Sequence, residues 1–597
     1  MLRHDRVRPP LLQSRCGLGR AELGDVPQEQ QIGLVHSRYP RFEAGGDGCG
    51  VDAMPNQSIG PTPWLCRSVV RLAVGPGRRN GEMPCPFRKP ARRQTRLNRF
   101  PESAAFRESI VEGGMQQMSA SAPKTENRVH AAADRLAWEI GRLDAHDQAA
   151  LVRRGELSAR ELCASAIARI EQLDPALNAI THRDYDAALT RAERAQGEMA
   201  GVPWLLKDGL DYRGMPNRSG SQLYRDAPPG EIEFAFTRAF DRAGLIALGK
   251  TNAPEFGLLP TTEPLLYGPA RNPWAADRSP GGSSGGAAIA VATGMTPLAH
   301  AADGGGSIRI PACCCGVIGL KPGRGATARA RAPHLIEDLL ACDMLLARSV
   351  RDVDWAMRTA SAAPVRPARR DAGLRIAVVL DSLDGRAPHP QVRESVLRSA
   401  QLCRDLGHEV FEAGRPYDGP ATLTAFKTVW AYLARDIAQG ATARFGPAAE
   451  TLAEPWTLEL AQWAGGVRIG DTDAMMQAIA DARGALQRFF ATTDVVLSPV
   501  LDRPALRIGE LGPSAGFGHI MELMFDYVSY TPLHNLTGHP AMSLPLFPAA
   551  DGVPIGSMFA AAHGGENTLI ALAYQLEQAM PWRDRWPPIL PHGTGAG

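Results

Sequence analysis

Two clusters of glycine and serine lie close together near the middle of the chain. The first has the sequence Gly-Gly-Ser-Ser-Gly-Gly over residues 281–286 and contains Ser283, and the second is residues 304–307, three glycines followed by Ser307. A serine hydroxyl attacks the carbonyl of an amide only if another group removes its proton. Glycines let the backbone pass close to a ligand and adopt conformations that other residues cannot. These residue types therefore indicate an active site that uses serine chemistry.

Three other interpretations of the clusters are weaker. A flexible linker is disfavoured because the second cluster continues into an apolar Cys/Val/Ile-rich run that is typical of a buried strand. Neither cluster continues into the Gly-Lys-Ser/Thr of a phosphate-binding loop or has the spacing of a dinucleotide fingerprint. Ser307 is followed by Ile308 and Arg309, so the Gly-x-Ser-x-Gly elbow of many serine hydrolases is absent.

The base for such a serine has to come from elsewhere, since His300 is the one histidine near either cluster. Lys207 follows the apolar run Val-Pro-Trp-Leu-Leu at residues 202–206. Burial in such a segment disfavours the charged form of a lysine and lowers its pKa towards neutrality. Lys207 is therefore a candidate base, although a lysine that merely extends from a strand end to the surface has the same sequence signal. Lys250 is a rival candidate.

The two clusters, together with Gly-Val-Pro-Trp-Leu-Leu-Lys-Asp at residues 201–208, resemble the amidase signature family of serine hydrolases. The resemblance implies that Ser307 is the nucleophile, that Ser283 is a bridging serine after a cis peptide bond, and that Lys207 is the base. It also implies an oxyanion hole built from backbone N–H groups. The residues that would supply these groups are Gly304, Gly305, Gly306 and Ser307.

Residues beside the nucleophile are expected to support its loop. Asp303 and Arg309 flank the loop, and a paired carboxylate and guanidinium would hold its backbone. Ser284 is assigned to the same supporting group. The adjacent cysteines 313–315 do not indicate a metal site, because neighbouring side chains in a strand point to opposite faces and metal motifs space their cysteines apart. The implied acyl-enzyme mechanism needs neither a metal nor a cofactor.

The chain alternates segments with strand and helix patterns, which predicts an α/β protein. Asp144 is expected to begin one helix, and the capping box that starts at Ser158 predicts a second helix before Pro175. A strand is predicted at residues 245–249, and the segments 374–380, 391–406 and 409–411 have the pattern strand, helix, strand. The resemblance implies the amidase signature fold, a large mixed β-sheet covered by helices on both faces.

We expect residues 115–590 to form a single amidase domain. The core motifs lie within residues 200–325, a variable region that shapes substrate choice spans about 326–490, and core motifs return at 491–582. Residues 1–114 scatter Pro, Gly and Arg without helical or strand period, which predicts disorder. Met115 and Met118 precede the first helical pattern, so an over-extended gene start before one of them is a second interpretation of this segment.

Bulk properties restrict the partners of the protein. A net charge of +2 argues against nucleic acid as a partner. No apolar run approaches the roughly 20 residues that span a bilayer, so we expect no membrane anchor. The cysteines have no disulfide-framework spacing, which favours a reducing cytoplasm. We therefore expect a cytoplasmic enzyme with a small-molecule amide as substrate, and the sequence leaves a monomer and a homodimer open.

Shorter motifs at residues 262–264, 271–274 and 297–300 resemble the branch of the family that contains 6-aminohexanoate cyclic-dimer hydrolases. This resemblance implies a linear or cyclic amide as substrate, although Gly304 and Gly305 stand where that branch has two alanines. Two alternatives stay open. One is the amidase component of a tRNA-dependent amidotransferase, which works with a partner protein, and the other is a catalytically silent scaffold that uses an amidase-like surface for binding.

Overall fold

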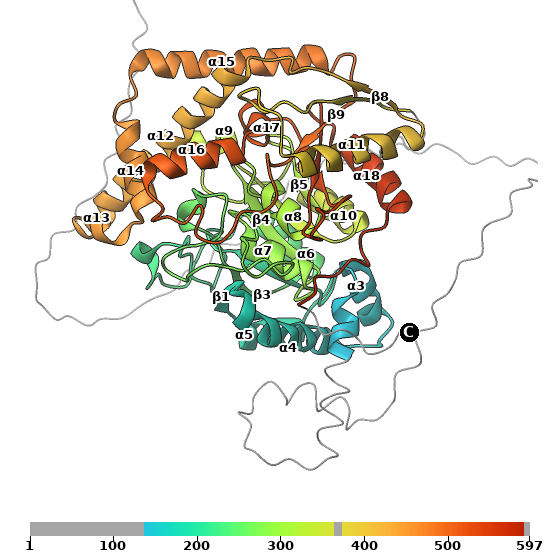
Figure 1. The fold of residues 1–597 in the computed structure, drawn as a ribbon. Coiled ribbons are helices and arrows are strands. Elements are labelled where there is room, and N and C mark those ends of the chain that lie inside the picture. The colour runs from blue at the N-terminus through green and yellow to red at the C-terminus, as the bar shows by residue number, and fades with distance from the viewer. Residues whose placement is uncertain (1–135, 363–372, 590–597) are drawn as a thin grey trace, which may run out of the picture. The chain divides into compact units, whose positions relative to one another are not determined.

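The computed structural model of the protein describes residues 136–362 and 373–589 (Figure 1). All of these residues belong to one compact unit. The expectations for residues 1–114, and for a start at Met115 or Met118, fall outside the described residues and stay predictions.

Helices and strands alternate along the described chain, as the sequence predicts for an α/β protein. The strands are β1 (Ile180–Arg183), β2 (Pro203–Lys207), β3 (Ile246–Thr251), β4 (Leu298–Asp303), β5 (Gly319–Lys321), β6 (Cys342–Ala347), β7 (Arg375–Val378), β8 (Glu409–Glu412), β9 (Val495–Pro499), β10 (Ala541–Leu544) and β11 (Ser557–Ala561). The α-helices are α3 (Ala145–Arg153), α4 (Ala159–Leu177), α5 (Tyr185–Ala192), α6 (Ala235–Ala243), α7 (Gly285–Ala292), α8 (Arg309–Cys315), α9 (Leu335–Leu340), α10 (Val350–Ala360), α11 (Pro390–Asp405), α12 (Gly419–Phe445), α13 (Ala448–Leu452), α14 (Pro455–Ala464), α15 (Ile469–Phe489), α16 (Phe517–Tyr527), α17 (Pro532–Thr537) and α18 (Glu566–Ala579).

The strands form two mixed sheets. The five-stranded sheet has the order β1-β3-β2-β4-β6, in which β2 runs parallel to β3 and β4 and the outer strands are antiparallel to their neighbours. The six-stranded sheet has the order β5-β10-β11-β9-β7-β8, with β7 parallel to β8 and β9. Ile318 and Ala347 join the sheets by donating N–H bonds to each other's carbonyl groups at 2.9 and 3.4 Å. The mixed sheet that the sequence predicts is therefore present as two linked parts.

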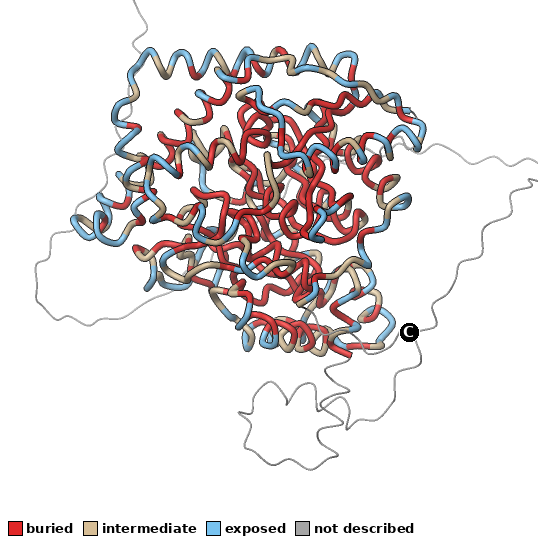
Figure 2. The backbone as a smooth tube through the Cα atoms, in the orientation of Figure 1, coloured by how far each residue is buried: buried red, intermediate tan, exposed pale blue. Residues whose placement is uncertain are grey.

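Both faces of the central strands are covered. Every residue of β2, β3, β6, β9, β10 and β11 is buried. Neighbouring side chains of a strand point to opposite faces, so a strand with no exposed residue has other structure packed on both of its faces. Figure 2 shows this buried centre surrounded by partly exposed helices. The prediction of a sheet covered on both faces is confirmed.

Local signals place the first helices as predicted, with one difference. The side chain of Asp144 accepts the N–H of Asp147 at the start of α3, and Ser158 forms a complete capping box at the start of α4. The sequence predicts that α4 ends before Pro175, but the helix continues to Leu177 and ends where Asn178 adopts a left-handed conformation. Proline is disfavoured inside a helix, but it does not have to end one.

Two short buried helices follow the two glycine-rich loops. All residues of α7 and α8 are buried, and α7 packs against β2, β3 and β4 while α8 packs against β5 and β10. The glycines of α7 permit this packing, because a Cβ at Gly286 would lie 2.5 Å from the backbone nitrogen of Asn252. The strand predicted at cysteines 313–315 is wrong, since these residues form the end of α8. A short apolar run fits a buried helix and a buried strand equally well.

Helices α12 to α16 form a second layer, drawn in gold to red-orange along the top and upper left of the molecule in Figure 1. Helix α12 packs against both α14 and α15, and α14 packs against α16. Glu255 connects this layer to the rest of the chain through hydrogen bonds. Its carboxylate accepts the N–H of Glu454 at 2.9 Å and the hydroxyl hydrogens of Ser221 and Thr457 at 2.6 and 2.5 Å.

Glu454, at the start of α14, makes this junction sensitive to pH. Burial and the nearby charge of Glu255 raise the pKa of Glu454 to about 8. The folded chain therefore keeps a proton that the unfolded chain releases near pH 4. The contribution of this proton to stability is full below that pH and is lost as the pH rises through about 8.

The substitution Glu454→Gln imitates the protonated side chain at every pH. We expect it to raise the melting temperature by roughly 2 °C at pH 9, and to have a much smaller effect at pH 5, where wild-type Glu454 is protonated. Thermal unfolding of the full chain at both pH values measures the difference. The matched control is Glu459→Gln, at an exposed position of α14. An equal effect at both pH values, or the same pH dependence in the control, would contradict the account.

Candidate active site

Lys207 and Ser283 are hydrogen-bonded partners at the centre of the sheet. Lys207 is the last residue of β2, and Ser283 lies in the loop that leads into α7. The Nζ atom of Lys207 donates to the Oγ atom of Ser283 at 2.6 Å, and both residues are buried, with 7% and 2% exposure. The peptide bond between Gly282 and Ser283 is cis, as the resemblance implied. Side chains 76 residues apart in the sequence are thus brought into contact.

The surroundings of Lys207 favour its neutral form. Burial lowers the pKa of its ammonium group, and the charge of Arg331 lowers it further, while Asp343, Asp303 and Asp208 act in the opposite direction. The resulting pKa is about 7, compared with 10.5 for a free lysine. A substantial fraction of the lysine is therefore neutral near pH 7 and able to accept a proton.

The loop that carries Ser307 is held by one carboxylate. Asp303 forms a two-point ion pair with Arg309, at 2.9 Å to Nε and 3.0 Å to Nη2, and both residues are fully buried. The same carboxylate accepts the backbone N–H groups of Gly306 at 2.7 Å and Ile308 at 3.2 Å. Burial alone would raise the pKa of Asp303, but the charge and hydrogen bonds of Arg309 keep it below its ordinary value. The predicted pairing of Asp303 with Arg309 is present.

These hydrogen bonds leave a particular set of backbone donors unused. Within the described residues, the N–H groups of Gly304, Gly305 and Ser307 have no acceptor in the protein. Gly306 differs from the expectation, because its N–H is already bonded to Asp303. The amide of Ser307 thus lies between two amides that are fixed on Asp303, and it remains able to bind an incoming oxygen.

Two residues whose contacts with this loop the sequence did not predict complete the loop support. Asn535, in α17, donates its amide to Asp303 at 2.8 Å and accepts from Arg309 at 2.7 Å. Thr531 donates its hydroxyl to the carbonyl of Gly305 at 2.6 Å. Both residues lie within the returning core motifs predicted at 491–582, but their residue types alone gave no sign of contact with residues more than 200 positions earlier.

The remaining candidates have supporting contacts. The Oγ atom of Ser284 lies 3.3 Å from both the carbonyl and the N–H of Ala302, so it ties the first loop to β4. The rival base Lys250 donates to the carbonyl of Leu210. In the part of the chain that the structure describes, Lys207 is the lysine whose hydrogen bond reaches an active-site serine.

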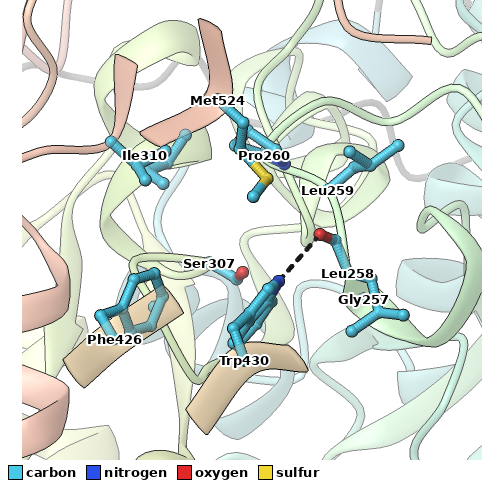
Figure 3. A pocket seen from close by; sticks show the side chains of 11 residues that line it. Gly257, Leu258, Leu259, Pro260, Ser307, Ile310, Phe426, Trp430 and Met524 are labelled. Atoms are coloured by element: carbon cyan, nitrogen blue, oxygen red, sulfur yellow. Dashed lines mark hydrogen bonds between the residues drawn. The ribbon is translucent and has the colours of Figure 1, made fainter. Parts of the chain in front are cut away.

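Ser307 faces a small apolar pocket (Figure 3). The volume of the pocket is about 20 Å³, and a cavity of that size holds about one water molecule. Its other lining residues, mostly apolar side chains from the segment after β3, the loop after β4, and α8, α12 and α16, are Gly257, Leu258, Leu259, Pro260, Gly305, Ile310, Phe426, Trp430, Met524 and Val528. The indole nitrogen of Trp430 donates to the carbonyl of Leu258 at 3.3 Å, which fixes α12 over the pocket.

Gly257 links this pocket to the Lys207–Ser283 pair. It lines the pocket of Ser307, and a Cβ at its position would lie 3.0 Å from Ser283 Oγ and 3.9 Å from Lys207 Nζ. Its φ angle of 70° belongs to the left-handed region that favours glycine. The two serine loops and Lys207 therefore meet around Gly257. Any larger residue at this position would place its side chain against Ser283 and Lys207.

Other kinds of site have no support in the described residues. No group of three or more His, Cys, Asp or Glu residues in residues 136–362 and 373–589 could hold a metal ion. Over the same ranges, no helix is both long enough and apolar enough to cross a bilayer. The six cysteines described there are all free and buried.

A mixed sheet that presents a lysine, hydrogen-bonded to a serine, beside two glycine-rich loops defines the class of amidase signature enzymes. The comparisons with known proteins agree with this class. The family model described as Amidase matches residues 161–570, and the chain therefore belongs to the amidase family, whose members are hydrolases that act on carbon–nitrogen bonds of amides.

Individual relatives cover most of the chain. A protein of Mycobacterium leprae named "Putative amidase AmiC" is 38% identical over 472 residues, which are 76% of this chain and 98% of that protein. The 6-aminohexanoate-cyclic-dimer hydrolase of Paenarthrobacter ureafaciens is 34% identical over 479 residues, 75% of this chain and 97% of the enzyme. A solved structure of 6-aminohexanoate cyclic dimer hydrolase superposes with a TM-score of 0.70 at 31% identity, covering 76% of this chain and 99% of that one.

Proposed function

We propose that the protein hydrolyses a carboxylic amide through a covalent acyl-enzyme on Ser307. Ser307 attacks the carbonyl carbon, and its proton passes through the hydroxyl of Ser283 to Lys207. The same relay returns a proton to the leaving amine, and a water molecule then releases the acyl group. The observation that carries the proposal is the 2.6 Å bond between Ser283 and a buried lysine whose pKa is about 7.

The backbone of the nucleophile loop supplies the oxyanion site in this proposal. The free N–H groups of Gly304, Gly305 and Ser307 would bind the negative oxygen that develops as Ser307 attacks. Because Asp303 fixes the loop in advance, these donors need no rearrangement during the reaction. Preorganised donors of this kind are each worth roughly 3 kcal/mol of transition-state stabilisation.

The apolar side chains beside Ser307 support a substrate with an apolar acyl chain, which enters this pocket of about 20 Å³ only if the lining side chains move. The pocket offers aliphatic and aromatic surface and, apart from Ser307, no charged or hydroxyl side chain. The relatives named as 6-aminohexanoate cyclic dimer hydrolases point to the same chemistry, because their named substrate carries an aliphatic chain on its carbonyl. We propose linear or cyclic aliphatic amides as substrates. The free cysteines agree with activity in the cytoplasm.

A panel of amides tests this proposal with the isolated chain. The purified protein is incubated with linear and cyclic aliphatic amides, aryl amides and glutamine, and release of amine is measured. Hydrolysis of aliphatic amides by the chain alone is expected. Activity on glutamine that appears only with a partner protein would favour the amidotransferase alternative, and a folded chain without any amidase activity would favour a silent scaffold.

Gly305 is expected to set the width of the pocket. A Cβ at Gly305 would lie 2.7 Å from Phe426 Cζ, whereas a Cβ at Gly304 would lie 3.5 Å from Trp430, an ordinary contact distance. Gly305→Ala should therefore lower kcat/KM by about tenfold, because a small displacement of aligned groups has an effect of this order. Gly304→Ala should cost less.

The second substitution Phe426→Leu tests the cause of that loss. It gives the added methyl group of Gly305→Ala room, so the double variant should recover most of the lost kcat/KM. Steady-state kinetics on the preferred amide are measured for the wild type, Gly305→Ala, Phe426→Leu and the double variant. A double variant as slow as Gly305→Ala would show that contact with Phe426 is not the reason.

A further inference from the structure

A second cavity borders Lys207. Lys207 lines it, and so do His300, Arg331, Glu337 and Asp343. Its volume is about 190 Å³, and Gly257 forms part of its wall as well as part of the wall of the Ser307 pocket. The proposed mechanism uses Lys207 but none of the other charged groups of this cavity.

The charged groups form one connected network. Arg331 donates to both carboxylate oxygens of Asp343, and its Nη1 atom lies 3.5 Å from a carboxylate oxygen of Glu337. His300 Nε2 lies 3.1 Å from Asp343 as well. Four elements contribute, since Asp343 is in β6, His300 in β4, Glu337 in α9, and Arg331 in the segment that precedes α9. The guanidinium is therefore held in a fixed position on the wall of the cavity.

Arg331 and Asp343 act on Lys207 in opposite directions. A positive charge beside the cavity disfavours a second positive charge on Lys207, and a carboxylate favours it. Lys207 and Asp343 are buried, and charges at buried sites interact more strongly than charges in water. Other groups also face Lys207 from neighbouring elements: Asp208 and Asp211 follow β2, His300 and the Arg309-bound Asp303 are in β4, and Glu337 is in α9.

We propose that Arg331, fixed by Asp343 and Glu337, is a positioning residue whose charge determines over which pH range Lys207 is free to accept the proton of the serine relay. The proposal rests on the proposed amidase mechanism. In the described residues Arg331 pairs with Asp343 and Glu337 and has no hydrogen bond to Lys207, Ser283 or Ser307, so in this proposal its effect passes through the base alone. The Arg331–Asp343 ion pair and Lys207, which has to be neutral to accept a proton, line the same cavity. The ion pair has no other evident role.

The pH dependence of kcat/KM tests the proposal in two directions. Arg331→Met removes the positive charge and leaves Asp343, so the acidic limb should move to higher pH by about 0.5 to 1 unit, which corresponds to a three- to tenfold loss at pH 6. Asp343→Asn removes the negative charge and leaves Arg331, so the limb should move to lower pH. Arg331→Lys retains the charge and should stay close to the wild-type limb.

Controls separate this effect from damage to the fold. Arg329 lies two positions from Arg331, is exposed to solvent and pairs with Asp338. The substitution Arg329→Met should leave the acidic limb unchanged. If Arg331→Met does not fold, the remaining two variants still give different predictions, a shift to lower pH for Asp343→Asn and no shift for Arg331→Lys. Shifts of Arg331→Met and Asp343→Asn in the same direction, or an unchanged limb in either of these two variants when folded, would overturn the inference. A wild-type enzyme without any acidic limb would instead overturn the proposed role of Lys207.

Discussion

The substitution Ser307→Ala should abolish amide hydrolysis, lowering kcat by roughly 10⁵-fold or more, as loss of a serine nucleophile does in other hydrolases. The variant should fold normally. Asp303 holds the loop through the backbone N–H groups of Gly306 and Ile308, and these bonds do not need the hydroxyl of Ser307. Steady-state assays on the preferred amide, with circular dichroism to verify the fold, measure both expectations.

Ser543→Ala is the matched control for this experiment. Ser543 is a fully buried serine in β10, and within the described residues its hydroxyl has no hydrogen-bond partner. Removing that hydroxyl breaks no bond, so activity should stay within about twofold of the wild type, as expected for a site outside the catalytic contacts. Undiminished activity of Ser307→Ala would show that Ser307 is not the nucleophile. An inactive Ser543→Ala would show that the loss of activity reflects unfolding.

The substitution Lys207→Met should lower kcat/KM by roughly 10³-fold, within the range that positioned acid–base groups contribute. The reason is that Met keeps the apolar stem of the side chain but cannot take a proton from Ser283. In the wild type, only the neutral lysine accepts a proton, and its pKa is about 7. Activity should therefore rise with pH through about 7, level off above about 8, and fall about tenfold per pH unit on the acidic side.

The variant Lys207→Arg separates a base from a fixed positive charge. Arginine keeps a cation at this position but does not give up its proton at any pH used for assay. It should be as inactive as Lys207→Met if Lys207 works as a base. Substantial activity in Lys207→Arg, or a pH profile that decreases through pH 7, would contradict the proposed role.

The sequence singled out Lys207, Ser283 and Ser307 as site candidates because they lie in three recognisable segments. Lys207 ends an apolar strand, and Ser283 and Ser307 stand in glycine-rich loops around a buried helix. The pairing of Asp303 with Arg309 was also predictable, since the two residues flank one short loop. Local signals of this kind also predicted the helix starts at Asp144 and Ser158.

The rest of the site depends on contacts between distant parts of the chain. Asn535 reaches Asp303 across 232 positions, and Phe426 meets Gly305 only because α12 packs over the nucleophile loop. Hydrophobic periodicity predicts that a helix is buried, but it does not predict what the helix covers. The shape of the pocket and the charged cavity behind Lys207 therefore required the three-dimensional structure.

Labelling with a fluorophosphonate, followed by mass spectrometry of the modified peptide, tests the central claim most directly. The reagent forms a stable adduct with a serine whose hydroxyl is activated by a base. The account predicts one adduct, on Ser307, that forms faster as the pH rises through about 7 and is lost in Lys207→Met. A folded protein that forms no adduct, or an adduct on a serine other than Ser307, would contradict the claim that Ser307 is the nucleophile.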